Sequence, residues 1–142
     1  MVNKKYLNLI KHLRNNARTP LTSISKITHT PVSTLHDRLK LTEDKYINKH
    51  TSLLDFQKLG YALRAKVLVN STAVIKLKDF IRENPKINSA YNLQGDYNFL
   101  LDCIFQDMLD FNNFIEDLSL LPISSKQVYF VYEDIKREAF LA

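Results

Sequence analysis

The sequence contains few of the residues that build covalent or metal-held frameworks. Cys103 is the single cysteine in 142 residues, which excludes a disulfide within the chain and a cysteine-built zinc site. It lies in the apolar run NFLLDCIF, so a small buried hydrophobe is favoured over a nucleophile. No apolar run approaches the roughly 20 residues of a membrane span. The N-terminus MVNKKYLNLIKHLRNN lacks the apolar core and cleavage site of a signal peptide, so we expect a cytoplasmic protein that has no membrane partner.

Glycine is also scarce, and the sequence offers no catalytic motif. The two glycines, Gly60 and Gly95, belong to neither a glycine-rich phosphate loop nor a nucleophile elbow. All four histidines lie in the first 60 residues, and none has the histidine–carboxylate spacing of a metal site. The sequence therefore predicts no enzyme, no metal and no cofactor.

Charge is present but unevenly distributed. Residues 1–60 hold 11 Lys and Arg against 4 Asp and Glu, a net charge of +7, whereas residues 61–142 hold 9 against 11, a net charge of −2. A basic half joined to a nearly neutral half favours a nucleic-acid-binding module attached to a second module. The alternative is a chance clustering of surface lysines.

The first half predicts three short helices that share one core. We expect helices over 4–15 and 21–28, and a third from Thr30, as N-cap, through Pro31 to about Lys45. Residues 46–60 read as a hinge, with a short strand or extended segment near 46–49 and a turn at Gly60. The expected core residues are Leu7, Ile10, Leu13, Ala17, Leu21, Ile24, Ile27, Val32, Leu35 and Leu39.

The second half alternates between strand and helix periods. Strands are expected over 61–70, 86–93, 98–105 and 123–132, with helices after Ser71 or Thr72 and from Asp107 to about Leu118. The order βαββαβ is the ferredoxin-like arrangement, with an antiparallel sheet and both helices on one face. The tail 133–142 is either a docked helix or a frayed end. The predicted domains are thus 1–45, a hinge 46–60, 61–132, and a tail 133–142.

The third helix has an apolar side and a polar side. Val32, Leu35 and Leu39 share one stripe. The opposite, polar face fits two interpretations equally well: contact with a DNA major groove, or simple exposure to solvent. Asp37 is expected to pair with a cation, either Lys40 or a neighbour of Leu41 on the next turn, and Leu41 points outward without an evident reason. The outward residues are Ser33, Thr34, Asp37 and Lys40, with His36 and Arg38 on the flanks. The candidate phosphate contacts are Arg38, Lys40, Arg14, Arg18, Lys4 and Lys5.

The order of these elements resembles the Lrp/AsnC, or feast/famine, transcription regulators over nearly the whole chain. The resemblance rests on the segments LNLIKHLRNNART, TPVSTLHDRLK, INKHTSLLDFQKLGYALRAKVLV and NLQGDYNFLLDC. It implies an α+β protein with an N-terminal helix-turn-helix module, winged-helix-like, and a C-terminal ferredoxin-like module. It also implies homodimers joined through the sheets, which assemble further into tetramers or octamers. The DNA-facing residues would be Ser33, Thr34, His36, Arg38 and Lys40.

In this family the second hairpin lies near an amino-acid site between dimers. The resemblance places Gly95, Asp96, Tyr97 and Asn98 there, although Asn98 stands where the family usually has an aspartate. Lys45 likewise stands where the family usually has a glycine. For Asp96 a turn-closing bond to the backbone is the favoured interpretation, with the ammonium of an amino acid as the alternative.

These observations predict a regulator that binds double-stranded DNA at a roughly palindromic site and responds to an amino acid or a similar small effector. One alternative is a nucleoid-type protein that binds DNA with little sequence preference. Another is a decarboxylase of siroheme-type tetrapyrroles with the same architecture. That chemistry requires histidine or arginine around a pocket, but residues 61–142 contain no histidine and only Arg64, Arg82 and Arg137.

Overall fold

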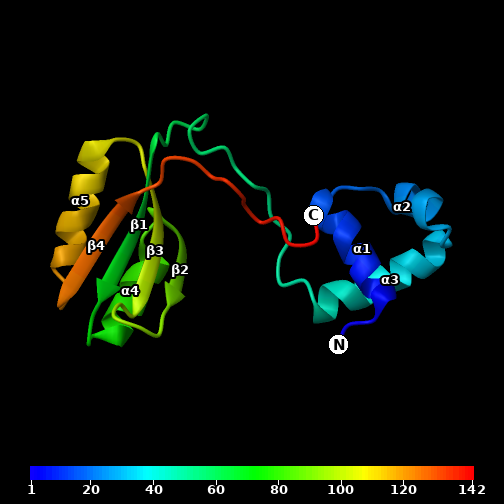
Figure 1. Cartoon of the computed structure of the whole chain (residues 1–142), viewed down its shortest axis with the longest axis horizontal. Helices are drawn as coiled ribbons and strands as arrows, with labels where there is room; N and C mark the ends of the chain where they lie inside the picture. The colour runs from blue at the N-terminus through cyan, green and yellow to red at the C-terminus, as the bar shows by residue number, and fades with distance from the viewer. The chain divides into compact units, whose positions relative to one another are not determined.

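The computed structural model describes all 142 residues, which divide into two units (Figure 1). The first unit contains residues 1–53 together with residues 135–142, and the second contains residues 54–134. No helix combines the length with the apolar character needed to cross a bilayer.

Three helices form the first unit: α1 (Lys4–Asn15), α2 (Leu21–Thr28) and α3 (Val32–Lys45). The predicted bounds of α1 and α2 are confirmed, and α3 ends at the predicted residue. Its predicted start is wrong, because Pro31 is the N-cap and Thr30 does not cap the helix. The Thr30 hydroxyl instead donates to the Thr28 carbonyl, while Ser25 donates to the Thr30 carbonyl, so both hydroxyls fasten the α2–α3 turn. The first unit contains no strand, so the expectation of a winged-helix-like module is wrong in that respect.

The turn between α2 and α3 also carries a residue with a left-handed backbone. His29 has φ 52° and ψ 35°, a region that histidine adopts more readily than most residues with a side chain. This conformation ends α2 and lets the chain enter α3 after two further residues. Two helices joined by such a short turn are the arrangement that the sequence predicts around TPVSTLHDRLK.

The core of the first unit is smaller than the sequence predicts. Leu9, Leu13, Ile24 and Leu35 are buried, and Leu21, Leu39 and Ile47 pack against them. Ile27 and Val32 are instead exposed, at 63% and 42%, and Ala17 is exposed as well. A spacing of three residues drifts by about 60° around a helix, so Ile27, two such steps beyond Leu21, has left the inward face. Leu9 and the buried Thr42 are core residues that the sequence analysis missed.

Residues 46–62 contain neither strand nor α-helix. The strand alternative near 46–49 is therefore wrong, whereas the turn at Gly60 is confirmed. Gly60 has φ 91°, a conformation that side chains disfavour. The Phe56 carbonyl accepts from Leu59 N and Tyr61 N, which closes this turn, and the Phe56 side chain is buried.

The second unit confirms the βαββαβ order. Its elements are β1 (Leu63–Asn70), α4 (Val74–Glu83), β2 (Ile87–Asn92), β3 (Phe99–Phe105), α5 (Met108–Ser119) and β4 (Ser125–Phe130). The strands lie in the order β2-β3-β1-β4, and all three pairings are antiparallel. The last strand is shorter than the predicted 123–132. Asp107 caps α5 as predicted, but α4 has Ala73 as N-cap, and Ser71 Oγ accepts from the Ala73 N–H.

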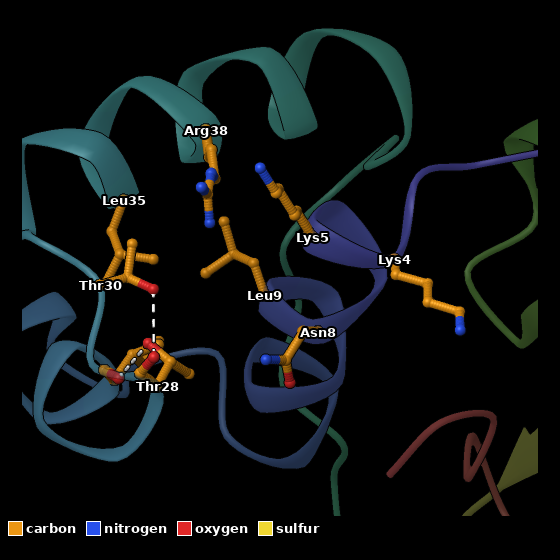
Figure 2. A pocket seen from close by; sticks show the side chains of 9 residues that line it. Lys4, Lys5, Asn8, Leu9, Thr28, Thr30, Leu35 and Arg38 are labelled. Atoms are coloured by element: carbon orange, nitrogen blue, oxygen red, sulfur yellow. Dashed lines mark hydrogen bonds between the residues drawn. The ribbon is translucent and has the colours of Figure 1, made fainter.

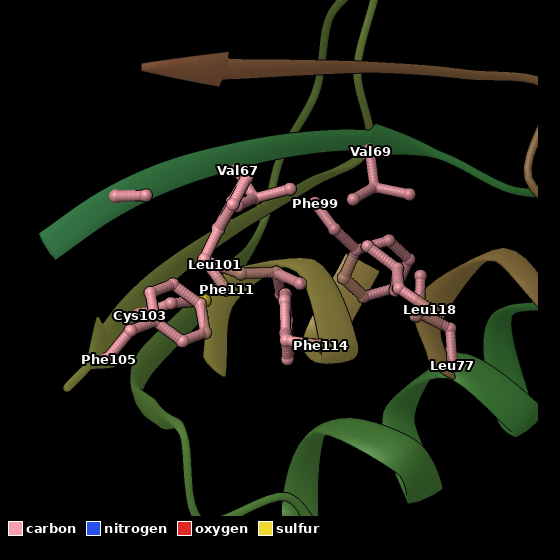
Figure 3. Packing of buried hydrophobic residues seen from close by; sticks show 11 residues of the cluster. Val67, Val69, Leu77, Phe99, Leu101, Cys103, Phe105, Phe111, Phe114 and Leu118 are labelled. Carbon is pink, nitrogen blue, oxygen red and sulfur yellow. The ribbon is translucent and has the colours of Figure 1, made fainter. Parts of the chain in front are cut away.

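The core of this unit lies between the sheet and its two helices (Figure 3). Alternate residues of β1 and all odd-numbered residues of β3 face the helices, as the period of two requires. The Phe105 ring lies 5.4 Å from that of Phe111 and 5.2 Å from that of Phe114. Cys103 is wholly buried here, and burial raises the pKa of its thiol to about 12, so the predicted buried hydrophobe is confirmed.

An ion pair joins the start of β2 to the first turn of α5. Lys86 Nζ lies 2.7 Å from Asp110 Oδ2, and the Gln106 N–H donates to the same oxygen. Burial raises the pKa of Asp110, but these two hydrogen bonds outweigh burial and hold the pKa below its ordinary value of 3.8. A carboxylate of this kind stabilises the fold above its unfolded pKa and loses that contribution as the pH falls through its folded pKa.

We therefore expect Lys86→Met to lower the free energy of unfolding at pH 7 and to lower it less as the pH falls below about 4. The methionine retains an apolar stem beside Tyr61, whose ring lies 5.9 Å from Lys86 Nζ. Urea unfolding of both proteins at pH 7 and pH 3 measures the difference. A difference of equal size at both values would show that Lys86 acts by packing rather than by its charge.

Candidate functional site

The outward face of α3 carries a stripe of small polar and cationic side chains. Ser33, Asp37 and Lys40 are exposed as predicted, and His36 and Leu41 are exposed as well. The predicted outward position of Thr34 is wrong, because Thr34 lies half-buried with Arg38 on one flank. The predicted pair between Asp37 and Lys40 is wrong, since neither side chain has a partner. Exposed pairs of this kind contribute little, and both side chains reach into water.

The flank of α3 forms one wall of a cavity within the three-helix unit. The cavity has a volume of about 310 Å³ and is lined by α1, α3 and the end of α2 (Figure 2). Lys5 and Arg38 point toward one another across it, whereas Lys4 points away. The remaining lining residues are Asn8, Leu9, Ile24, Thr28, Thr30 and Leu35, with no carboxylate among them.

The C-terminal segment contacts Arg14, which was predicted to contact a DNA phosphate. Arg14 donates to the Glu138 carbonyl at 2.6 Å and to the Phe140 carbonyl at 3.0 Å, and it lies 3.5 Å from the Glu138 carboxylate. The tail thus docks on α1, although not as the helix that was one alternative. Arg18 is exposed, and its side chain has no partner.

The docked tail increases the positive charge of the first unit. Residues 1–53 and 135–142 hold 12 Lys and Arg against 4 Asp and Glu, a net charge of +8, whereas residues 54–134 hold 8 against 11, a net charge of −3. The unit that carries the exposed stripe of α3 is therefore the strongly basic part of the chain.

The hairpin loop between β2 and β3 holds the four candidate effector residues. Gly95 and Asp96 are exposed, Tyr97 and Asn98 are half-buried, and the Asp96 carboxylate forms no hydrogen bond. The turn-closing bond favoured for Asp96 is therefore absent. Gly95 has φ 156°, and a Cβ built there would meet nothing within 4 Å.

Asn98 fixes this loop to the end of β1. Its Nδ2 donates to the Ser71 carbonyl at 2.7 Å, and its Oδ1 accepts from Ser71 N at 3.1 Å. The amide is thus engaged on both sides, and Ser71 in turn donates to the Pro122 carbonyl. Sequence reasoning placed Asn98 at an effector site and missed this bridge, which joins residues 27 positions apart.

We expect Asn98→Asp to destabilise the second unit by about 1–3 kcal/mol at pH 7, because a carboxylate cannot donate to the Ser71 carbonyl and would repel it. Urea unfolding measures the change, with the exposed neighbour Asn92→Asp as the matched control. Equal stability of Asn98→Asp and the parent chain would mean that the bridge contributes nothing.

The face of the sheet away from the helices carries a charged cluster that sequence analysis did not single out. Asp102 is only 7% exposed, with Lys66 Nζ at 3.0 Å and Arg64 Nη2 at 3.8 Å from its Oδ1. Arg64 also pairs with Asp134 at 2.6 Å. Lys66 and Asp102 lie opposite each other in the β1–β3 register. A prediction of this strand register from the sequence would therefore have identified the ion pair. The same face carries the apolar residues Leu68, Leu100, Ile104, Tyr91 and Tyr129.

The family profile described as the Lrp/AsnC ligand binding domain matches residues 65–140. The chain belongs to the Lrp/AsnC family. The matched residues begin in β1 and extend through the sheet and α5 into the docked tail, so they include the β2–β3 hairpin and all of the charged cluster except Arg64.

Curated relatives of this Lrp/AsnC protein are transcriptional regulators. The HTH-type transcriptional regulator FL11 of Pyrococcus horikoshii is 33% identical over 117 residues, which cover 80% of this chain and 78% of that protein. The transcriptional regulator AzlB of Bacillus subtilis is 28% identical, over 77% of this chain and 73% of its own. The family and these relatives are regulators and not enzymes, which argues against the decarboxylase alternative.

Solved structures share the architecture over almost the entire chain. A transcriptional regulator from Neisseria meningitidis, crystallised as an L-Met complex, has a TM-score of 0.86 and 28% identity, covering 96% of this chain and 94% of its own. The E. coli AsnC structure has a TM-score of 0.85, covering 100% of this chain and 99% of its own. At 14% identity the latter supports the fold alone.

Proposed function

We propose that this Lrp/AsnC regulator binds double-stranded DNA through a helix-turn-helix module, residues 1–45, with α3 in the major groove. The observation that carries the proposal is the exposed stripe of Ser33, His36 and Lys40 on α3, in a unit with a net charge of +8. Small hydroxyls permit close approach to base edges, and cations favour the phosphates on either side. Thr34 and Arg38 lie on the flank of the same helix.

Phosphate contacts are proposed for cations that the fold leaves unpaired. Lys4, Lys5 and Arg18 have no carboxylate partner, and neither do Arg38 and Lys40. Arg14 is withdrawn from this set, because its guanidinium is engaged by the C-terminal segment.

We also propose a homodimer joined through residues 61–132, and one face of the sheet supports it. Leu68, Leu100 and Ile104 are apolar residues on the face of the sheet opposite to α4 and α5. A second copy would bury them together with the Asp102 cluster. Two copies of α3 would then contact half-sites about 34 Å apart on a roughly palindromic site. Assembly into tetramers or octamers is proposed on the family relationship.

An amino acid or a similar small effector is proposed to bind at the β2–β3 hairpin. The support is the L-Met complex of the Neisseria relative, together with the unengaged carboxylate of Asp96. Gly95 and Tyr97 lie beside that carboxylate in the loop. Asn98 contributes here by holding the loop in place rather than through a free amide.

Selection from a random pool of duplexes by the purified full chain tests this function. We expect an enriched inverted repeat that binds more tightly than unrelated duplexes at the same salt concentration. L-Met and the other common amino acids are then added one at a time, and a changed affinity identifies the effector. Equal affinity for all duplexes would favour the nucleoid-type alternative, which the net charge of +8 also supports. A pool from which no duplex is bound would overturn DNA binding itself.

A further inference from the structure

Two cations converge on the cavity of the three-helix unit without a counter-ion between them. Lys5, in the first turn of α1, and Arg38, on the flank of α3, point toward one another (Figure 2). Neither forms an ion pair or a side-chain hydrogen bond, and none of the nine lining residues is acidic. Like charges that converge in this way repel each other unless an anion lies between them.

The remaining lining residues favour an anion over a zwitterion. An amino acid would leave its ammonium without a carboxylate partner, whereas a phosphate could accept hydrogen bonds from both Lys5 and Arg38. The guanidinium of Arg38 offers a planar pair of donors that suits two phosphate oxygens, and Lys5 adds a point charge. The free side-chain amide of Asn8 can donate as well, and the N-terminal end of α1 adds a positive potential.

The cavity also has the size and rigidity of a binding site for a small group. Its volume of about 310 Å³ lies at the lower end of the range of about 300–1,000 Å³ typical of ligand pockets. Its floor is formed by Leu9, Ile24 and Leu35, none more than 2% exposed, so core packing holds its walls.

We propose that this cavity is a phosphate site in which Lys5 and Arg38 together hold one phosphate group, either of a DNA backbone or of a free organic phosphate. If the phosphate belongs to a DNA backbone, the proposal rests on the DNA-binding function proposed above. If it belongs to a free organic phosphate, the proposal is independent of DNA binding. Arg38 then acts through the backbone phosphate beside α3, while Lys40 belongs to the separate outward stripe.

The salt dependence of DNA affinity tests whether the bound phosphate belongs to the DNA backbone. The logarithm of DNA affinity falls with the logarithm of salt concentration by about 0.9 for each phosphate neutralised. We expect Lys5→Ala and Arg38→Ala each to reduce this slope by no more than about 0.9, and the double variant to reduce it by about 0.9 rather than about 1.8. Lys11→Ala is the matched control, because Lys11 is an exposed cation of α1 that does not line the cavity. A reduction of about 1.8 in the double variant would mean two separate phosphates and would overturn the proposal.

Direct titration in the absence of DNA tests whether the cavity binds a free phosphate. Inorganic phosphate and AMP are titrated at low salt into the full chain and into the same variants, with amide chemical shifts as the readout and glycine as a control ligand. We expect shifts around Lys5 and Arg38 with both phosphates, their loss in Arg38→Ala, and no such shifts with glycine. A slope reduced by about 0.9 in the double variant identifies DNA as the source of the phosphate, and phosphate binding that is lost in Arg38→Ala identifies a free phosphate; either result supports the site. If the chain binds no DNA, the proposed function is overturned, but this titration still shows whether the cavity binds a phosphate group. An unchanged slope together with no variant-sensitive phosphate binding would overturn it.

Discussion

Leu35→Ala is expected to lower the free energy of unfolding of the three-helix unit by about 2–5 kcal/mol. Leu35 is 2% exposed and packs in a cluster of only four buried residues, with Leu9, Leu13 and Ile24. A core of this size has few neighbours that can move inward to fill a cavity. The helices are too short to persist individually, so loss of the shared core unfolds all three.

Because the two units of the chain have separate cores, the second unit serves as an internal control for this prediction. The second unit has its own core, built around Val67, Leu101 and Phe105, and Leu35 is not part of it. Hydrogen exchange should therefore rise in α1 and α3 of the variant and stay unchanged in β1 and β3. Leu41→Ala on the same helix is the matched control, since Leu41 is 43% exposed, and its truncation should cost less than about 0.5 kcal/mol. Equal costs for the two leucines would mean that α3 does not pack as described.

Elements set by local patterns could be predicted from the sequence. The bounds of α1 and α2 follow from apolar periodicity, and Asp107 caps α5 through a bond to a residue three positions away. In β1, the alternation that buries Val67 and Val69 identified the face toward the helices. The order of these elements then limited the second unit to the ferredoxin-like arrangement.

Contacts between residues far apart in the sequence could not be predicted in this way. Nothing near Arg14 indicates that the carbonyls of Glu138 and Phe140 will engage it, and nothing near Asn98 indicates its bridge to Ser71. In both cases a polar side chain for which a binding role was predicted is engaged in hydrogen bonds within the fold. The error at Thr30 is similar on a smaller scale, because its hydroxyl could cap α3 or close the preceding turn, and the turn prevails.

Combined replacement of Arg38 and Lys40 by alanine is expected to weaken DNA binding by about 10- to 100-fold at low salt without lowering the melting temperature. Neither side chain has a partner whose loss would destabilise the fold, and Lys40 is exposed. Affinity is measured on the selected duplex by fluorescence anisotropy, and stability by thermal unfolding. Lys76→Ala with Lys78→Ala is the matched control, because it removes two exposed cations from α4 in the other unit. Similar losses in the two double variants would mean that net charge alone governs binding.

The salt dependence of this double variant separates two roles for α3. Lys40 lies on the outward stripe and Arg38 on the flank beside Lys5, so their contacts should be independent. If both contact phosphates, the slope should fall by more than about 0.9 and by up to about 1.8, since Lys5 still contacts the phosphate that it shares with Arg38. If Lys40 reads a base edge instead, the slope should fall by no more than about 0.9, and preference for one base pair of the selected site should relax. Unchanged affinity at every salt concentration would leave α3 an ordinary surface helix and would remove the major-groove assignment.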